Sequence, residues 1–273
     1  MTFLGILRSD LRRAFVSPRL VLVTLLVYAV YMASGYYEYL YAFDSYYDVA
    51  TLFDFLHYTG VYVTMIILCA SFCYSDAFCT DWKEKALYLY CVRGSTKNYC
   101  AARVLTCALA GGLGPVLGLL LFVITFSFRF PLLDVRGGRY GSTVDEVAAL
   151  TENHSIISPV ILSENGALYF ALMFYLVFLV CALYAVVGLA VSAIIPNRFV
   201  AIFSPYLLYF LESLFLSKIP VMKSIQIMSG NFSFGLGVFG NLLVITLVIG
   251  SMIALLGVFF TKMVKRKLAN ETN

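Results

Sequence analysis

Six long hydrophobic runs, separated by shorter polar segments, divide this chain of 273 residues. Each run reaches the roughly 20 apolar residues that a helix needs to cross about 30 Å of hydrocarbon. The runs are too continuous for barrel strands, in which apolar and polar residues alternate. We therefore predict an all-α integral membrane protein with six transmembrane helices. The predicted helices cover residues 19–39, 55–74, 101–128, 167–195, 198–216 and 241–262.

Composition supports this class. The chain is 62% hydrophobic and 12% charged, with a mean hydropathy of +0.90, whereas soluble domains are about 45–50% apolar and about 25% charged. The formal net charge of +4 is small and gives no reason to expect a nucleic-acid partner. The basic N-terminal stretch lacks a small-residue cleavage site, so we expect no removable signal peptide.

Cysteine and histidine usage argues against cross-links and metals. None of the seven cysteines falls in a segment that we place outside, and no CxxC occurs, so we expect reduced thiols. Only His57 and His154 could add imidazole ligands, and they lie far apart in the sequence. We therefore expect no metal site.

The distribution of basic residues predicts the orientation. Fourteen of the 19 Lys and Arg residues lie in the N-terminal segment, between the second and third runs, after the fourth run or in the C-terminal tail. The positive-inside rule therefore places both termini in the cytoplasm. The external segments are then residues 40–54, which are acidic and aromatic, residues 129–166, which are long and polar, and residues 217–240. The last is too interrupted for a seventh span, and we predict a re-entrant-like segment there.

Residues 1–17 form an amphipathic pattern. One face carries apolar residues at helical spacing, and the other carries the charges. The apolar residues are Leu4, Leu7, Leu11 and Phe15, and the charged ones are Arg8, Asp10, Arg12 and Arg13. Ser17-Pro18 should end this helix before the first span. The pattern predicts an interfacial helix, acting either as a topology anchor or as an elbow that packs against a partner's span.

The segment from residue 76 to residue 100 is a charged interruption between the second and third spans. We predict a cytoplasmic helix in which Asp81 caps the N-terminus and Glu84 completes a capping box. Phe78 and Trp82, four apart, should share one face, and Asp81 and Lys85 should pair. This aromatic knob flanked by charge either docks into a soluble partner or anchors the chain at the membrane interface.

The end of that segment also carries turn signals. Gly94, after Arg93, is well placed to end the short helix, and Ser95 or Thr96 can cap the next helix. Gly94-Ser95-Thr96-Lys97 lacks the order and spacing of a phosphate-binding GxxxxGK[ST] loop, and that loop occurs nowhere in the chain.

The order of these elements resembles the type-2 ATP-binding-cassette permeases of bacterial exporters. The resemblance covers nearly the whole chain in layout, and its most specific part is Asp81–Arg103, which is similar to the family's coupling helix and the turn that follows it. The turn Val92-Arg93-Gly94 lacks the Pro that is frequent in that family, and residues 129–166 make a longer loop than usual.

The resemblance implies a dimer with a second or homologous permease copy, bound to cytoplasmic ATPase subunits in a bacterial plasma membrane. ATP and Mg²⁺ would be held by the partner subunit, so we expect this chain to bind no cofactor and not to be an enzyme by itself. Its substrate would be an amphipathic peptide, a drug or a lipid-like molecule. The residues that would couple to the ATPase are Phe78, Asp81, Trp82, Glu84, Lys85, Arg93 and Gly94.

Residues within or beside the spans are further candidates. Glu212 is an acid late in the fifth run, where it would face a pathway, pair with Lys218 or serve structure. Pro205 should kink the same helix. Tyr36 and Tyr37 belong to a dense aromatic stretch that forms either an interfacial belt or a vestibule for an amphipathic or cationic substrate.

Three other functions fit the layout less well. An intramembrane enzyme needs a motif such as HExxH, GxSxG or paired Asp at membrane depth, and the sequence contains none. A secondary transporter usually shows several buried charges and internal repeats. A membrane sensor or immunity protein would bind its ligand without a partner ATPase.

Overall fold

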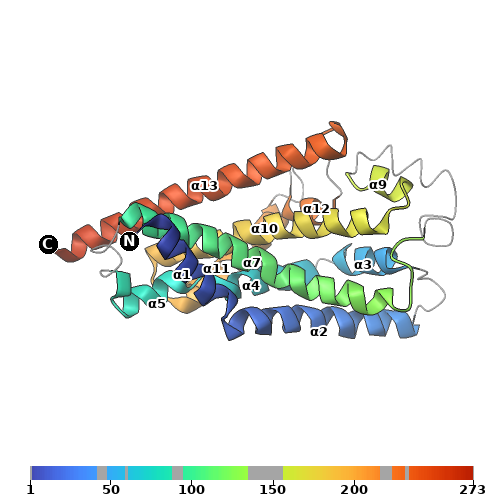
Figure 1. Ribbon diagram of the computed structural model, residues 1–273, viewed down its shortest axis with the longest axis horizontal. Coiled ribbons are helices and arrows are strands. Elements are labelled where there is room, and N and C mark those ends of the chain that lie inside the picture. Colours follow the sequence, from blue (N-terminus) through green and yellow to red (C-terminus); the bar gives the residue numbers. More distant parts are fainter. Residues whose placement is uncertain are drawn as a thin grey trace.

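The computed structural model describes residues 2–41, 48–58, 61–87, 95–134, 156–215, 223–230 and 234–272. Over these ranges the chain is helical and contains no β-strand. The helices are α1 (Phe3–Phe15), α2 (Pro18–Tyr41), α3 (Val49–Tyr58), α4 (Val61–Tyr74), α5 (Ala77–Lys83), α7 (Thr96–Ser127), α9 (Ser158–Leu162), α10 (Gly166–Ile194), α11 (Arg198–Phe215), α12 (Ser224–Met228) and α13 (Gly237–Thr272). They form an elongated bundle, with α5 toward one end and α3 and α9 toward the other (Figure 1).

Six helical stretches within the described ranges are long and apolar enough to cross a membrane. This confirms the predicted all-α class and its six helices of membrane-spanning length and hydropathy. The stretches are Pro18–Tyr37, Tyr62–Lys83, Thr96–Ser127, Gly166–Ile194, Arg198–Phe215 and Gly237–Asn270. The predicted break at Ser17-Pro18 is also confirmed, because α1 ends at Phe15 and α2 begins at Pro18.

The second span differs from its predicted range of 55–74. Residues 55–58 belong to α3, a separate helix that begins at Val49 inside the predicted external segment 40–54. The Asp48 carboxylate fixes the start of α3, since one oxygen accepts from Thr51 N at 2.6 Å and the other from Asp134 N at 2.9 Å. Backbone carbonyls of residues 131 and 132 accept from the first two amides of α3. These distant partners satisfy the backbone amides at the start of α3.

His57 is fully buried in α3. Its Nδ1 lies 3.0 Å from the hydroxyl of Tyr31 in α2, and its ring stacks on Phe53 at a centroid distance of 4.4 Å. These contacts pack α3 against α2, so His57 belongs to the aromatic core at that end of the bundle.

The helix α1 does not pack against the bundle through its apolar stripe. Ile6, Asp10 and Ala14 are the buried residues of the helix, whereas Leu4 is 72% exposed. The apolar stripe that includes Leu7, Leu11 and Phe15 is only partly covered. Asp10 therefore turns inward, against the prediction that placed it on the polar face.

Close contacts between α7 and its neighbours hold the centre of the bundle. A Cβ atom built on Gly111 would lie 2.3 Å from the Cβ of Ala185 in α10, and one built on Gly118 would lie 2.7 Å from the carbonyl oxygen of Thr24 in α2. The Thr24 hydroxyl also donates to the Gly114 carbonyl at 3.2 Å. The glycines of α7 thus allow the close backbone approach that the small-residue spacing at Gly114 and Gly118 predicts.

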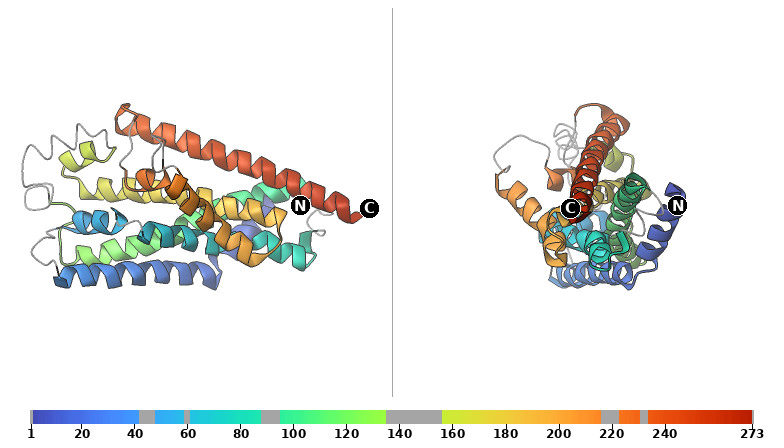
Figure 2. Two further views of the ribbon diagram at one scale, coloured as in Figure 1. Left: turned by 180° about the vertical axis from the view of Figure 1, so that it is seen from behind. Right: turned by 90° about the vertical axis from the view of Figure 1, so that its left-hand side faces the viewer.

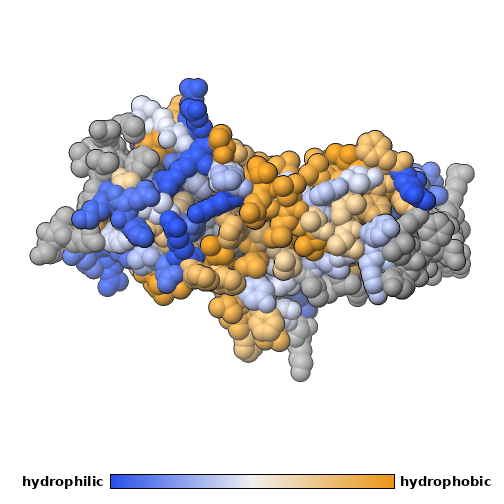
Figure 3. Space-filling model, turned by 90° about the horizontal axis from the view of Figure 1, so that it is seen from below, coloured by the Kyte–Doolittle hydropathy of each residue, from blue (hydrophilic) through white to orange (hydrophobic). Residues whose placement is uncertain are grey.

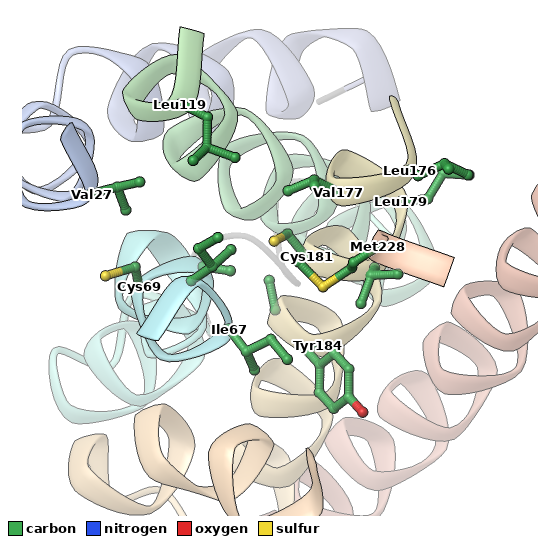
Figure 4. Packing of buried hydrophobic residues seen from close by; sticks show 14 of the residues in the cluster. Val27, Ile67, Cys69, Leu119, Leu176, Val177, Leu179, Cys181, Tyr184 and Met228 are labelled. Atoms are coloured by element: carbon green, nitrogen blue, oxygen red, sulfur yellow. The ribbon is translucent and has the colours of Figure 1, made fainter. Parts of the chain in front are cut away.

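Apolar side chains fill the space between the central helices. Figure 4 shows Val27 of α2, Ile67 of α4, Leu119 of α7 and Val177 of α10 converging on one cluster, and all four are buried. By contrast, 11% of the most apolar stretch of α13 is buried inside the protein, compared with 72% of the corresponding stretch of α10. The helix α13 runs obliquely along one side of the bundle (Figures 1 and 2). Much of its apolar surface is therefore available to lipid.

We expect Gly118→Leu to destabilise the bundle, because the new side chain would collide with the backbone of α2. Overpacking of this kind costs about 1–3 kcal/mol or more. Thermal unfolding of the detergent-solubilised protein measures the effect. The matched control is Gly250→Leu in α13, where nothing lies within 4 Å of a built Cβ. Equal midpoints for the two variants would contradict the close approach of α7 and α2.

Candidate functional site

Hydrophilic side chains gather at the end of the molecule where α1 and α5 lie, while a hydrophobic band covers the middle (Figures 1 and 3). The described charges that are buried most deeply also meet here. The site is built by the turn after α4, by α5 and by the facing parts of α1, α7 and α11.

A tight turn carries the chain from α4 into α5. Ser75 ties the turn to α10 by donating from its hydroxyl to the Ala185 carbonyl at 2.8 Å. Asp76 occupies the position before α5 but makes no side-chain bond to that helix. Its carboxylate instead accepts from Arg19 of α2 at 2.6 Å and lies 3.6 Å from Arg198 at the start of α11. The turn between α4 and α5 thus contacts three further helices, α2, α10 and α11.

The predicted capping role of Asp81 is wrong, because α5 begins at Ala77 and Glu84 stands after its last residue. The predicted pair between Asp81 and Lys85 is also wrong. Lys85 is exposed beyond the helix with a left-handed φ of 54°, whereas Asp81 is fully buried. The competing tertiary partners of Asp81 explain both differences.

Asp81 holds three helices together. One carboxylate oxygen accepts from Arg13 of α1 at 2.9 Å. The other oxygen accepts from the Tyr99 hydroxyl at 2.7 Å and from the Arg103 guanidinium, both in α7. Charge-assisted bonds of this kind are stronger than neutral ones. Asp81 is therefore the point at which α5 is bound to α1 and α7.

Arg103 is the largest fully buried side chain in the described part of the protein. Besides Asp81, it contacts the Tyr74 hydroxyl and lies 3.3 Å from Asp10 of α1. Its guanidinium carbon sits 5.6 Å and 5.2 Å from the ring centroids of Tyr74 and Tyr99. With Arg13 included, two cations face two carboxylates. We call Asp10, Arg13, Asp81 and Arg103 the buried ion-pair network, and its formal charges cancel.

Asp10 is the weakest member of the buried ion-pair network. Its Oδ1 faces Arg103, but its buried Oδ2 has no hydrogen-bond partner among the described residues. Burial raises the pKa of Asp10 from 3.8 to about 6, although the Arg103 charge acts in the opposite direction. The negative charge of Asp81 adds to the rise in the pKa of Asp10.

The predicted aromatic knob is covered by the chain's own C-terminal helix. Phe78 and Trp82 share a face and stack at 5.8 Å, but Phe78 is fully buried against Phe260 of α13. The ammonium of Lys267 lies 5.9 Å from the Phe78 ring and 5.3 Å from the Trp82 ring. These contacts explain why α13 continues past residue 262, where the predicted span ends. The charged residues left exposed at the end of α5 are Lys83, Glu84 and Lys85.

Two predicted coupling residues, Arg93 and Gly94, lie outside the described residues. The cap that follows them is confirmed, since the Ser95 hydroxyl accepts from Lys97 N at 3.2 Å at the start of α7. The role of the segment in contacting an ATPase stays a prediction.

Glu212 belongs to a separate polar cluster. Its half-buried carboxylate accepts from the Tyr184 hydroxyl of α10, and from Ser224 N and Ser224 Oγ at 2.6 Å and 2.8 Å. These bonds hold the start of α12 against α10 and α11. The alternative partner, Lys218, lies outside the described residues. The contacts of Glu212 therefore give it a structural role.

The other candidates within the spans do not join the buried ion-pair network. Pro205 is buried inside α11, where a Cβ on Gly188 of α10 would lie 3.0 Å from its ring. Tyr36 and Tyr37 are each 57% exposed near the opposite end of α2 from Arg19. Pro205 therefore serves close packing between α10 and α11.

One feature of the sequence indicates the buried ion-pair network, although the pattern of hydrophobic residues alone does not reveal it. Arg103 falls inside the predicted span 101–128, and a charge within a span requires a partner. Its acidic partners could not be chosen from spacing, because Asp81 and Arg103 are 22 residues apart and Asp81 and Arg13 are 68 apart.

Comparisons with family models, with curated proteins and with solved structures found no match to this chain. Among the described residues, no group of three or more His, Cys, Asp or Glu side chains could hold a metal ion. The described ion pairs of the site link helices and compensate the buried charges. Such an arrangement can transmit a displacement of α5 to α1 and α7.

We expect Arg103→Met to be strongly destabilising, because it leaves Asp10 and Asp81 buried with less compensation. Breaking a buried ion pair in this way costs about 3–5 kcal/mol. Unfolding of the solubilised protein by denaturant or heat measures the loss. The control is Arg198→Met, whose side chain is 52% exposed and whose pair with Asp76 should contribute less than about 1 kcal/mol. Similar losses for both variants would refute the buried role of Arg103.

The raised pKa of Asp10 predicts a pH dependence of stability. Between the ordinary pKa of 3.8 and about 6, the folded state binds more protons than the unfolded state, so stability falls as pH rises through this window. The Asp10→Asn variant lacks this titration. The difference in unfolding midpoint between wild type and Asp10→Asn should therefore decrease from pH 4 to pH 6 and then level off. A constant difference would show that burial does not perturb Asp10.

Proposed function

We propose that this chain is the membrane-spanning permease subunit of an ATP-driven exporter. It would form the translocation pathway as a dimer, with a second or homologous copy, and work with separate cytoplasmic ATPase subunits. The observation that carries the proposal is the double attachment of Asp81, which binds α5 to both Arg13 of α1 and Arg103 of α7.

The attachment gives α5 a mechanical role. A partner that moves during its ATP cycle would press on the exposed end of α5, where Lys83, Glu84 and Lys85 offer charges of both signs. Separating Asp81 from Arg103 would leave buried charges without compensation, which is costly. The helices α1 and α7 would therefore follow α5 as a rigid body.

The sequence supports placing the nucleotide chemistry on a partner. The chain has no GxxxxGK[ST] motif, which is the loop that holds nucleotide phosphates in such ATPases. By the positive-inside rule, the basic end with α1 and α5 would face the cytoplasm of a bacterial plasma membrane. ATP and Mg²⁺ would then meet the assembly on that side.

The surface of the spans supports the proposed substrate class. Apolar side chains of α11 and α13, such as Leu207, Leu211, Leu247 and Leu255, are exposed. A dimer built on such surfaces would present an apolar pathway, which suits an amphipathic peptide, a drug or a lipid-like molecule. We propose export of a molecule of this kind.

We expect Glu84→Lys to weaken binding of the ATPase by about tenfold, equivalent to about 1.4 kcal/mol. Reversing an exposed charge at the end of α5 would place like charges together at the docking surface. Recovery of a Walker-A-containing protein with the affinity-tagged chain, purified from its native membrane, measures the effect. The matched control is Glu164→Lys, because Glu164 is also exposed but follows α9, near the opposite end.

Two results would count against this assignment. Absence of any Walker-A protein in the wild-type purification would reject the permease and favour a sensor or immunity protein. Equal recovery of the Walker-A protein with both variants and with wild type would be compatible with a permease but would show that α5 does not form the docking surface.

A further inference from the structure

Two exposed arginines on α1 have no partner in the described part of the chain. The side chains of Arg8 and Arg12 are exposed and make no ion pair or hydrogen bond there. The other charges of the helix are engaged, since Arg13 binds Asp81 and Asp10 faces Arg103. The outer face of α1 is therefore positive, and among the described residues no acid pairs with it.

Helix geometry aligns these two arginines. At 3.6 residues per turn, Arg8 and Arg12 lie one above the other on the face opposite the buried stripe of Ile6, Asp10 and Ala14. Like charges at this spacing repel each other, and an anion bridging them would relieve the repulsion. The partly covered apolar stripe of α1 borders them on one side, so the face joins basic and apolar groups.

An open apolar groove begins where α1 ends. It has a volume of about 630 Å³ and is lined by Pro18, Val21, Leu22, Leu25 and Leu26, the outward residues of the first two turns of α2. The elbow at residues 16 and 17 connects this groove to the helix that carries Arg8 and Arg12. The two surfaces are thus continuous along the chain.

We infer that the outer face of α1 and this groove together bind one anionic phospholipid. The phosphate would contact Arg8 and Arg12, as guanidinium groups match phosphate oxygens, and an acyl chain would lie along the groove. A zwitterionic lipid would bind less well, because the cationic part of its headgroup would lie near the same arginines. This lipid site is independent of whether the chain is a permease.

A second copy of the chain fits this surface less well than a lipid. A symmetric contact would bring the same face of both subunits together. Arg8 and Arg12 would then meet cations of their own kind, and like charges across an interface are unfavourable. The positive charge favours an anion, and the groove favours one with a hydrocarbon tail.

The test uses the full-length protein reconstituted in phosphatidylcholine vesicles. Electron paramagnetic resonance compares the association of spin-labelled phosphatidylglycerol with that of spin-labelled phosphatidylcholine. We expect wild type to prefer phosphatidylglycerol and the double variant Arg8→Gln/Arg12→Gln to lose most of that preference. The loss of each arginine should lower the relative affinity for phosphatidylglycerol about fivefold. Arg8→Lys/Arg12→Lys, which keeps the charge, should retain most of it.

The matched control is Lys265→Gln/Arg266→Gln, which removes two exposed charges near the end of α13. It should keep the wild-type preference. The inference is overturned if Arg8→Gln/Arg12→Gln keeps the preference, or if the control loses as much, since the effect would then be general surface charge. Leu25→Cys separates lipid from a second copy: efficient disulfide cross-linking between two chains at this position would show that protein fills the groove.

Discussion

A buried guanidinium determines how the helices pack at one end of this protein. Arg103 is fully buried, and a charge removed from water is tolerated only when opposite charges and hydrogen bonds surround it. Asp81 and Asp10 supply the charge, while Tyr74 and Tyr99 supply hydroxyl or ring contacts. Because these residues come from α1, α4, α5 and α7, the need of one side chain fixes the relative positions of four helices.

The same requirement explains the orientation of α1. The helix α1 packs through Ile6, Asp10 and Ala14 rather than through its continuous apolar stripe. Pairing Asp10 with Arg103 and Arg13 with Asp81 requires this rotation. Its consequence is that Arg8, Arg12 and the apolar stripe face outward, where they are suited to a lipid surface.

Two kinds of close packing complete the bundle. The glycines of α7 let α2 and α10 approach its backbone, and α13 covers Phe78 through Phe260 and Lys267. The first fixes the centre of the bundle, and the second leaves only a small charged surface at the end of α5. Under the proposed function, a partner would contact that surface rather than an aromatic knob.

The sequence by itself determined features that depend on local physics. Six apolar runs predicted six spanning helices because span length is set by bilayer thickness, Pro18 marked the elbow, and Ser95 marked the start of α7 because capping is local. Tertiary structure decided the rest. The start of α3 at Val49 depends on the bonds of Asp48 and on carbonyls from the segment after α7. The partners of Asp81 lie up to 68 residues away, and sequence periodicity carries no information over that distance. They pair because assembly of the bundle removes these charges from water, and buried charges need opposite charges beside them.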